Sequence, residues 1–162
     1  MTMTKRTFLA SAAALLGGVA IGGCSKKTEA AAETFEVTKS PDQWRALLST
    51  AQFAVLRDAG TERPRSSPLN AEKRRGIYRC AGCALPVFAS QAKFESGTGW
   101  PSFTAPIPNA VRTKPDPGLF GTRTEAHCRR CGGHLGHVFD DGPPPTGQRW
   151  CMNGIAMEFV TA

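Results

Sequence analysis

Six cysteines are the residues of this chain best suited to chemistry, and their spacing separates them into three kinds. Four form two C-x-x-C pairs, while two stand alone: Cys80 with Cys83, Cys128 with Cys131, then Cys24 and Cys151. Two C-x-x-C turns can direct four thiolates at one ion, which is the tetrahedral environment that zinc prefers. Four protein ligands leave no open position, so we predict a structural zinc site. Two disulfides are the alternative in an exported protein.

Cys151 is the candidate nucleophile. On a strand, Arg149, Cys151 and Asn153 would face the same side, which places a cation and an amide beside the thiol. The cation favours the thiolate, and His134 or His137 upstream can supply a proton. The alternative is a small buried hydrophobic residue. The polar neighbours and the turn-rich D-G-P-P-P-T-G loop favour the nucleophile.

The first residues have the pattern of an export signal followed by a membrane anchor. Lys5 and Arg6 precede an apolar run over residues 8–21, which is shorter than the roughly 20 residues of a spanning helix. The run ends in I-G-G-C, which is similar to the lipobox of bacterial lipoproteins. We predict a signal peptide over residues 1–23 and lipidation of Cys24, with ordinary cleavage and a free thiol as the alternative. The protein is then exported to the periplasm or cell envelope and anchored to the membrane.

A flexible tether is expected over residues 24–38 and a single folded domain over residues 39–162. Ser40 and Pro41 signal a helix start, with Trp44, Leu47 and Leu48 on one face. A second short helix carries apolar residues and ends near Gly60: Phe53, Val55 and Leu56.

From residue 76 onward the pattern is one of short strands joined by turns, which predicts a mainly β, antiparallel fold. Expected strands lie at 77–80, 86–88, 100–103, 110–113, 120–128, 135–139, 148–152 and 155–160. The net charge of +7 comes from scattered basic residues and no aromatic-lined basic stripe, so we expect no nucleic-acid partner.

The chain resembles the B-type, methionine-R-sulfoxide reductase family along almost the whole predicted domain. The motifs that carry the resemblance are G-T-E at 60–62, Y-R-C-A-G-C at 78–83, K-F-E-S-G-T-G-W-P-S-F at 93–103, H-C-R-R-C-G-G-H-L-G-H-V-F-D-D-G-P at 127–143, P-T-G-Q-R-W-C-M-N at 145–153 and I-A-M-E-F at 155–159. The resemblance implies an antiparallel β fold with a four-cysteine zinc site and a shallow active site. It implies roles for seven residues: Cys151 as nucleophile, His134, His137, Arg149 and Asn153 around the reacting sulfur, and Trp100 and Phe103 against the substrate.

The implied reaction is reduction of the R epimer of methionine sulfoxide, free or in proteins. Cys151 attacks sulfur, a histidine protonates the oxygen, and Cys151 is left as a sulfenic acid. Many members of the family have a resolving cysteine where this chain has Thr98. We therefore expect recycling by an external thiol, thioredoxin-like or small, unless a free Cys24 forms a disulfide with Cys151. Trp150 and Gly154 also depart from the commoner residues, and we expect them to alter rate or preference. We expect a monomer, and a zinc-ribbon-like binding module is the rival interpretation.

Overall fold

A computed structural model describes residues 33–118 and 121–162 of the chain. The predicted signal peptide and Cys24 lie outside the described residues. Within the part of the chain that is described, no helix is long and apolar enough to cross a membrane. The folded unit begins at Glu33 and continues to Ala162.

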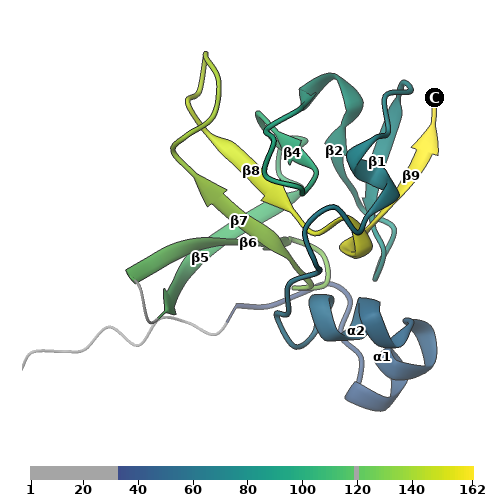
Figure 1. Cartoon of the computed structure of the whole chain (residues 1–162). Helices are drawn as coiled ribbons and strands as arrows, with labels where there is room; N and C mark the ends of the chain where they lie inside the picture. Colours follow the sequence, from purple (N-terminus) through teal and green to yellow (C-terminus); the bar gives the residue numbers. More distant parts are fainter. Residues whose placement is uncertain (1–32, 119–120) are drawn as a thin grey trace, which may run out of the picture. The chain divides into compact units, whose positions relative to one another are not determined.

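Two short helices open the folded unit, α1 (Pro41–Leu47) and α2 (Thr50–Leu56) (Figure 1). Each begins with a capping box, in which a serine hydroxyl accepts from the backbone three residues later and a glutamine side chain accepts in return. The predicted start at Ser40 is confirmed. The predicted apolar face is only partly correct, because Trp44 and Leu48 are buried whereas Leu47 is 57% exposed. Positions four apart share a face more closely than positions three apart on so short a helix.

Within the residues that the structure describes, nine strands form two antiparallel sheets, which confirms the predicted fold class. The smaller sheet has the order β2 (Pro86–Ala89), β1 (Gly76–Cys80), β9 (Met157–Thr161). The larger has the order β3 (Lys93–Phe94), β4 (Ser102–Phe103), β8 (Arg149–Met152), β7 (His134–Phe139), β6 (Gly121–Cys128), β5 (Val111–Gly118). Single-turn helices lie at Pro68–Asn70, Ser90–Ala92 and Gly154–Ala156. No sequence pattern predicted the two-residue strand β3.

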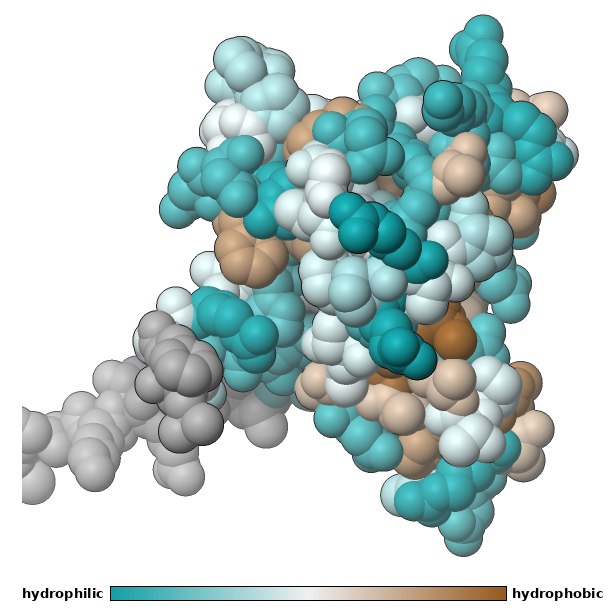
Figure 2. All heavy atoms as spheres, viewed as in Figure 1, coloured by the Kyte–Doolittle hydropathy of each residue, from teal (hydrophilic) through white to brown (hydrophobic). Residues whose placement is uncertain are grey.

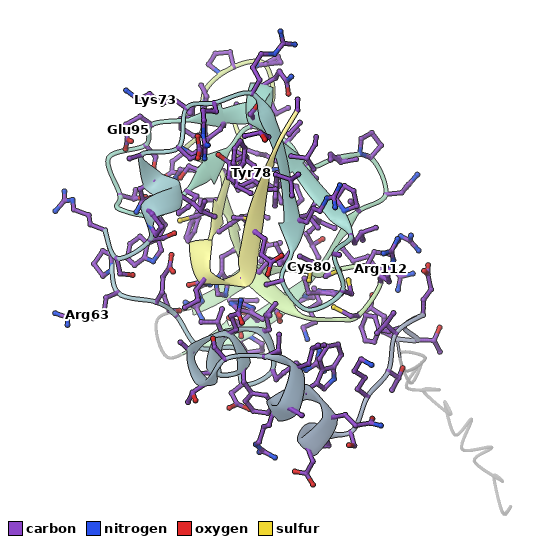
Figure 3. The ribbon with its side chains drawn as sticks, turned by 90° about the vertical axis from the view of Figure 1, so that its right-hand side faces the viewer. Arg63, Lys73, Tyr78, Cys80, Glu95 and Arg112 are labelled. Carbon is purple, nitrogen blue, oxygen red and sulfur yellow. The ribbon has the colours of Figure 1, made fainter. Side chains whose placement is uncertain are left out.

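Aromatic side chains from both sheets form the centre of the core. Tyr78 of β1 meets Phe103 of β4 edge-on at 4.9 Å between ring centroids, and Phe88 of β2 stacks on Phe103 at 4.3 Å. Such pairs contribute about 0.5–1.5 kcal/mol each beyond the area they bury. Burial raises the pKa of Tyr78 to about 12, so its hydroxyl remains protonated. Figure 3 shows Tyr78 inside the domain and Arg63 pointing outward, and the face viewed in Figure 2 is largely hydrophilic.

The described end of the predicted tether, residues 33–38, is fixed to the domain. The backbone N–H of Val37 donates to the Arg130 carbonyl at 3.0 Å, and Glu36 pairs with Arg129. A Cβ added to Gly132 would lie only 2.7 Å from the Phe35 ring, so the two residues are in close contact. The folded unit therefore starts about six residues earlier than the composition of the segment suggests.

Candidate active site and metal centre

The two C-x-x-C pairs meet where β1 and β6 end, and Figure 3 shows Cys80 at the end of its strand. The Sγ atoms of Cys80 and Cys131 are 3.7 Å apart, those of Cys83 and Cys128 are 3.5 Å apart, and all four lie within 4.8 Å of one another. Tetrahedral zinc with Zn–S bonds of about 2.3 Å places sulfurs roughly 3.8 Å apart, whereas a disulfide places them at about 2 Å. The cluster therefore fits a metal ion better than two disulfides, and it joins the two sheets.

The histidines near the second pair have partners other than the cluster. His127 Nε2 lies 3.0 Å from Glu33 Oε2, and His134 Nδ1 lies 2.9 Å from Glu125 Oε1. Neither contributes a donor atom to the four-cysteine group. Hydrogen bonds from the neighbouring thiols lower the pKa of Cys83, which favours a thiolate at the cluster. The donor set is thus all sulfur, as the sequence predicted.

One row of facing residues crosses five strands of the larger sheet and contains the candidate nucleophile. Cys151 on β8 faces Ser102 on β4 and His137 on β7. His137 in turn faces Glu125 on β6, which faces Lys114 on β5. Facing residues of antiparallel strands project from the same face of the sheet. The pairing register therefore brings a hydroxyl, a thiol, an imidazole, a carboxylate and an ammonium group into one line.

Gly136 allows β7 to approach β8 closely beside the nucleophile. A Cβ added at this position would lie 2.1 Å from the Cys151 carbonyl oxygen and 2.9 Å from the Met152 Cα. No side chain fits there unless the two strands separate. The glycine of the H-L-G-H motif thus brings His137 and Cys151 together.

Cys151 is half-buried, and burial raises the pKa of its thiol. The charge of Arg149 and hydrogen bonds from Thr98 and Ser102 act in the opposite direction without fully offsetting burial. The predicted effect of the cation is correct in sign, but desolvation outweighs it. Cys151 is therefore mostly a thiol at neutral pH before substrate binds.

Three hydroxyl groups form a chain next to the nucleophile. Ser96 Oγ lies 2.8 Å from both Thr98 Oγ1 and Ser102 Oγ, and Ser102 also donates to the Trp100 carbonyl at 3.1 Å. Thr98 occupies the position at which members of the family that this chain resembles often have a resolving cysteine. Of the cysteines in the described residues, all except Cys151 belong to the metal cluster. No second thiol of the described residues is therefore free to resolve Cys151.

Arg149 is held by a bidentate ion pair. Its Nε and Nη2 donate to the two oxygens of Asp141 at 2.8 and 2.9 Å, and its guanidinium lies 4.5 Å from the centroid of the Phe139 ring. The planar fork and the aromatic face fix the cation beside Cys151. The sequence did not predict a role for Asp141, although this residue lies in the H-V-F-D-D-G segment that carries part of the family resemblance.

Glu62 connects the substrate side of the site to the segment after β8. Its carboxylate accepts from the backbone N–H groups of Gly154 and Ile155 at 2.6 and 3.0 Å. Its carbonyl accepts from Trp100 Nε1 at 3.1 Å, and its N–H donates to Asn153 Oδ1 at 3.0 Å. Glu62 therefore positions two of the predicted site residues, Trp100 and Asn153. It belongs to the G-T-E motif, whose role the sequence did not indicate.

A cavity of about 160 Å³ opens over the nucleophile. Its walls are two aromatic rings and several polar groups: Trp100, Phe139, Arg123, His137, Cys151 and Asn153. An apolar side with a few convergent polar groups suits a small ligand with one polar substituent. Four of the predicted residues thus line one cavity, whereas His134 and Arg149 do not line it.

Phe103 does not line the cavity, although the sequence assigned it to the substrate. It is fully buried and belongs to the aromatic core with Tyr78 and Phe88. The reason is strand alternation, because Ser102 projects toward Cys151 and the next residue must project to the opposite face.

Comparison with known proteins agrees with this geometry. Residues 48–161 match the SelR domain family. The chain is 51% identical over 126 residues to the peptide methionine sulfoxide reductase MsrB of Methanosarcina barkeri, covering 77% of this chain and 89% of that protein. It is 50% identical over 125 residues to the MsrB of Agrobacterium fabrum, covering 76% and 93%. It is 49% identical over 124 residues to the MsrB of Pseudomonas entomophila, covering 76% and 95%. The chain belongs to the MsrB family of peptide methionine sulfoxide reductases.

Proposed function

We propose that this protein reduces the R epimer of methionine sulfoxide, free or in proteins, with Cys151 as the nucleophile. The observation that carries the proposal is the pairing of Cys151 with His137 across β7 and β8 at the cavity floor. A thiol and a proton donor there can reach the sulfur and the oxygen of one sulfoxide. Trp100 offers an apolar wall for the methyl group, and family membership supports the choice of the R epimer.

The chemical step transfers the oxygen to Cys151. The Cys151 thiolate attacks the sulfoxide sulfur and forms an S–S bond, while a histidine gives its proton to the oxygen. The protonated oxygen then passes to the Cys151 sulfur, as the S–O bond of the substrate and the new S–S bond both break. Methionine leaves reduced by two electrons, and Cys151 is oxidised to a sulfenic acid that carries the oxygen and the proton. Because burial raises the pKa of Cys151, the attacking thiolate forms only in a fraction of molecules at neutral pH.

Recycling uses an external thiol, which attacks the sulfenic sulfur and expels water. A second thiol then cleaves the mixed disulfide and restores Cys151. The four clustered cysteines and Thr98 support this one-cysteine cycle. Treating the mature protein with peroxide and mapping its peptides by mass spectrometry tests the cycle. A Cys24–Cys151 disulfide in place of the sulfenic acid would refute it.

The activity test offers the separated R and S diastereomers of methionine sulfoxide with dithiothreitol, using wild type and Cys151→Ser. We expect the wild type to reduce the R form and the variant to reduce neither. Unchanged activity in the variant, or reduction of the S form alone, would contradict the proposal. A binding module of zinc-ribbon type would show no turnover at all.

We also propose that the metal is zinc and that its role is structural. The four sulfur donors and their spacing support zinc, which would hold β1 of the smaller sheet to β6 of the larger. Metal analysis should give one zinc per chain, and a strong chelator should lower the melting temperature. Undiminished stability in the metal-free protein would contradict a structural role.

The location in the cell remains a separate proposal. Lys5, Arg6, the apolar run and Cys24 support an exported, lipid-anchored protein that repairs envelope proteins, and we propose that it acts as a monomer. Fractionation of cells that express the wild type and Cys24→Ser tests it. The wild type should follow the membrane and the variant should not. A soluble wild type would contradict the anchor.

A further inference from the structure

Residues 33–38, here called the strap, lie against the turn that carries Cys128 and Cys131. The side chains of Phe35 and Val37 are half-buried, whereas the other four residues of the strap are exposed. Val37 also packs against the hydrophobic core. The family match begins at residue 48, so it assigns no role to the strap.

The strap contacts the backbone of this turn at two places. The backbone N–H of Val37 donates to the Arg130 carbonyl at 3.0 Å, between the two cysteines of the turn. The Phe35 ring lies over Gly132, where an added Cβ would come within 2.7 Å of it. Gly132 has a φ of 68°, so a glycine here both permits the left-handed backbone and leaves room for the ring. The turn can therefore open only if these two contacts break or the strap moves with it.

A carboxylate of the strap adds charged contacts to the same turn. Glu36 pairs with Arg129, and its Oε2 lies 3.7 Å from Arg130 Nε. Arg130 also donates to the Cys83 carbonyl at 3.3 Å, so its side chain joins the second cysteine turn to the first. Exposed ion pairs stabilise weakly. We therefore expect the ring of Phe35 and the hydrogen bond of Val37 to contribute most of the stabilisation.

The two helices cover other sides of the cysteine cluster. A Cβ added to Gly82 would lie 3.6 Å from both the Trp44 ring and Cys131 Sγ, so α1 covers the first turn. A Cβ added to Gly133 would lie 2.9 Å from the Leu56 side chain and 3.4 Å from Cys131 Sγ, so α2 lies next to the end of the second turn. The strap and the helices thus enclose the cluster together.

We propose that the strap holds the second turn closed on the bound metal ion and slows release of the ion. This inference rests on the proposed zinc site. For the ion to leave, Cys128 and Cys131 must move away from it. That movement breaks the Val37 hydrogen bond and lifts Gly132 from the Phe35 ring. The strap therefore adds to the barrier for metal release although it provides no donor atom, and it connects the predicted tether to the metal centre.

The experiment loads the full chain with zinc and follows transfer of the ion to an excess of the coloured chelator 4-(2-pyridylazo)resorcinol, well below the melting temperature. Phe35→Ala should release zinc about 3- to 10-fold faster, because the burial of roughly half a phenylalanine side chain is lost. Glu36→Lys places a further cation beside Arg129 and Arg130 and should also speed release. Its effect should shrink in about 1 M salt, whereas the effect of Phe35→Ala should persist.

Leu47→Ala is the matched control, because it truncates an apolar side chain that is 57% exposed on α1. It should release zinc at the wild-type rate. Equal rates in wild type and Phe35→Ala, or the same acceleration in Leu47→Ala, would overturn the proposal.

Alkylation with iodoacetamide during release, mapped by mass spectrometry, shows where the site opens. In wild type we expect Cys83 to react first, because the other three cysteines of the cluster are buried. In Phe35→Ala we expect Cys128 and Cys131 to gain reactivity relative to Cys83. Simultaneous reaction of all four cysteines in that variant would indicate global unfolding and would also overturn the proposal. A wild type that binds no zinc would instead refute the proposed metal site itself.

Discussion

Gly136→Ala should nearly abolish activity by separating the two strands that carry His137 and Cys151. The added Cβ would lie 2.1 Å from the Cys151 carbonyl oxygen, and ordinary C···O contacts begin at about 3.3 Å, so the strands must part by roughly 1 Å. A displacement of roughly 1 Å in an active site can cost about 100-fold in rate. Forcing a methyl group into a packed site also costs about 1–3 kcal/mol of stability.

The assay compares kcat for R-methionine sulfoxide with thermal unfolding in Gly136→Ala and in the control Gly118→Ala. In the control, the added Cβ meets nothing closer than 3.4 Å, and the residue lies in the same sheet on β5. We expect the control to keep wild-type activity and melting temperature. If Gly136→Ala retained full activity while folded, the close approach of β7 and β8 would not be what positions the nucleophile.

Three further changes test other contacts. Arg149→Gln should raise the pKa of Cys151 further, so alkylation by iodoacetamide at neutral pH should slow; faster alkylation would contradict the electrostatics. Thr98→Cys should yield a disulfide with Cys151 after one turnover without thiol, by mass spectrometry, whereas wild type should yield only sulfenic acid. Glu62→Gln weakens the hydrogen bonds to Gly154 and Ile155 and should lower the free energy of unfolding in urea by about 1–3 kcal/mol; no loss would show that backbone packing alone holds this segment.

The sequence patterns correctly predicted those features that depend on only a few consecutive residues. The C-x-x-C spacing identified the metal donors, because the two sulfurs of each turn are set by four consecutive residues. Ser40 and Pro41 located the first helix, because a cap acts within one turn. Alternation along β8 correctly placed Arg149 and Cys151 on one face. The same alternation applied to β4 would have moved Phe103 to the core, where its ring stacks on Phe88.

Local patterns could not predict which strands pair or in which register, and two of the missed residues depend on that register. Asp116 and Glu125 reach His137 and His134 only because β5, β6 and β7 pair in one particular register. That register shifts at an irregularity between Ala126 and His127, which cannot be read from period-two hydrophobicity. Residues 33–38 were likewise assigned to a tether by composition, whereas Phe35 and Glu36 are held by partners about 90 residues away.

The metal centre explains how this register is maintained next to the nucleophile. Cys128 ends β6 and Cys131 lies in the turn before β7, so the two ligands close the hairpin that carries Glu125 and His134. The backbone N–H of Cys128 donates to the Gly133 carbonyl at 2.9 Å, which fixes the turn directly beside the shifted pair. A hairpin register is set by its turn, and a slip of one residue reverses the face of every side chain. A metal ion bound by this turn would thus keep His134 and His137 on the same face as Cys151. The effect of the ion would then extend beyond the residues that bind it.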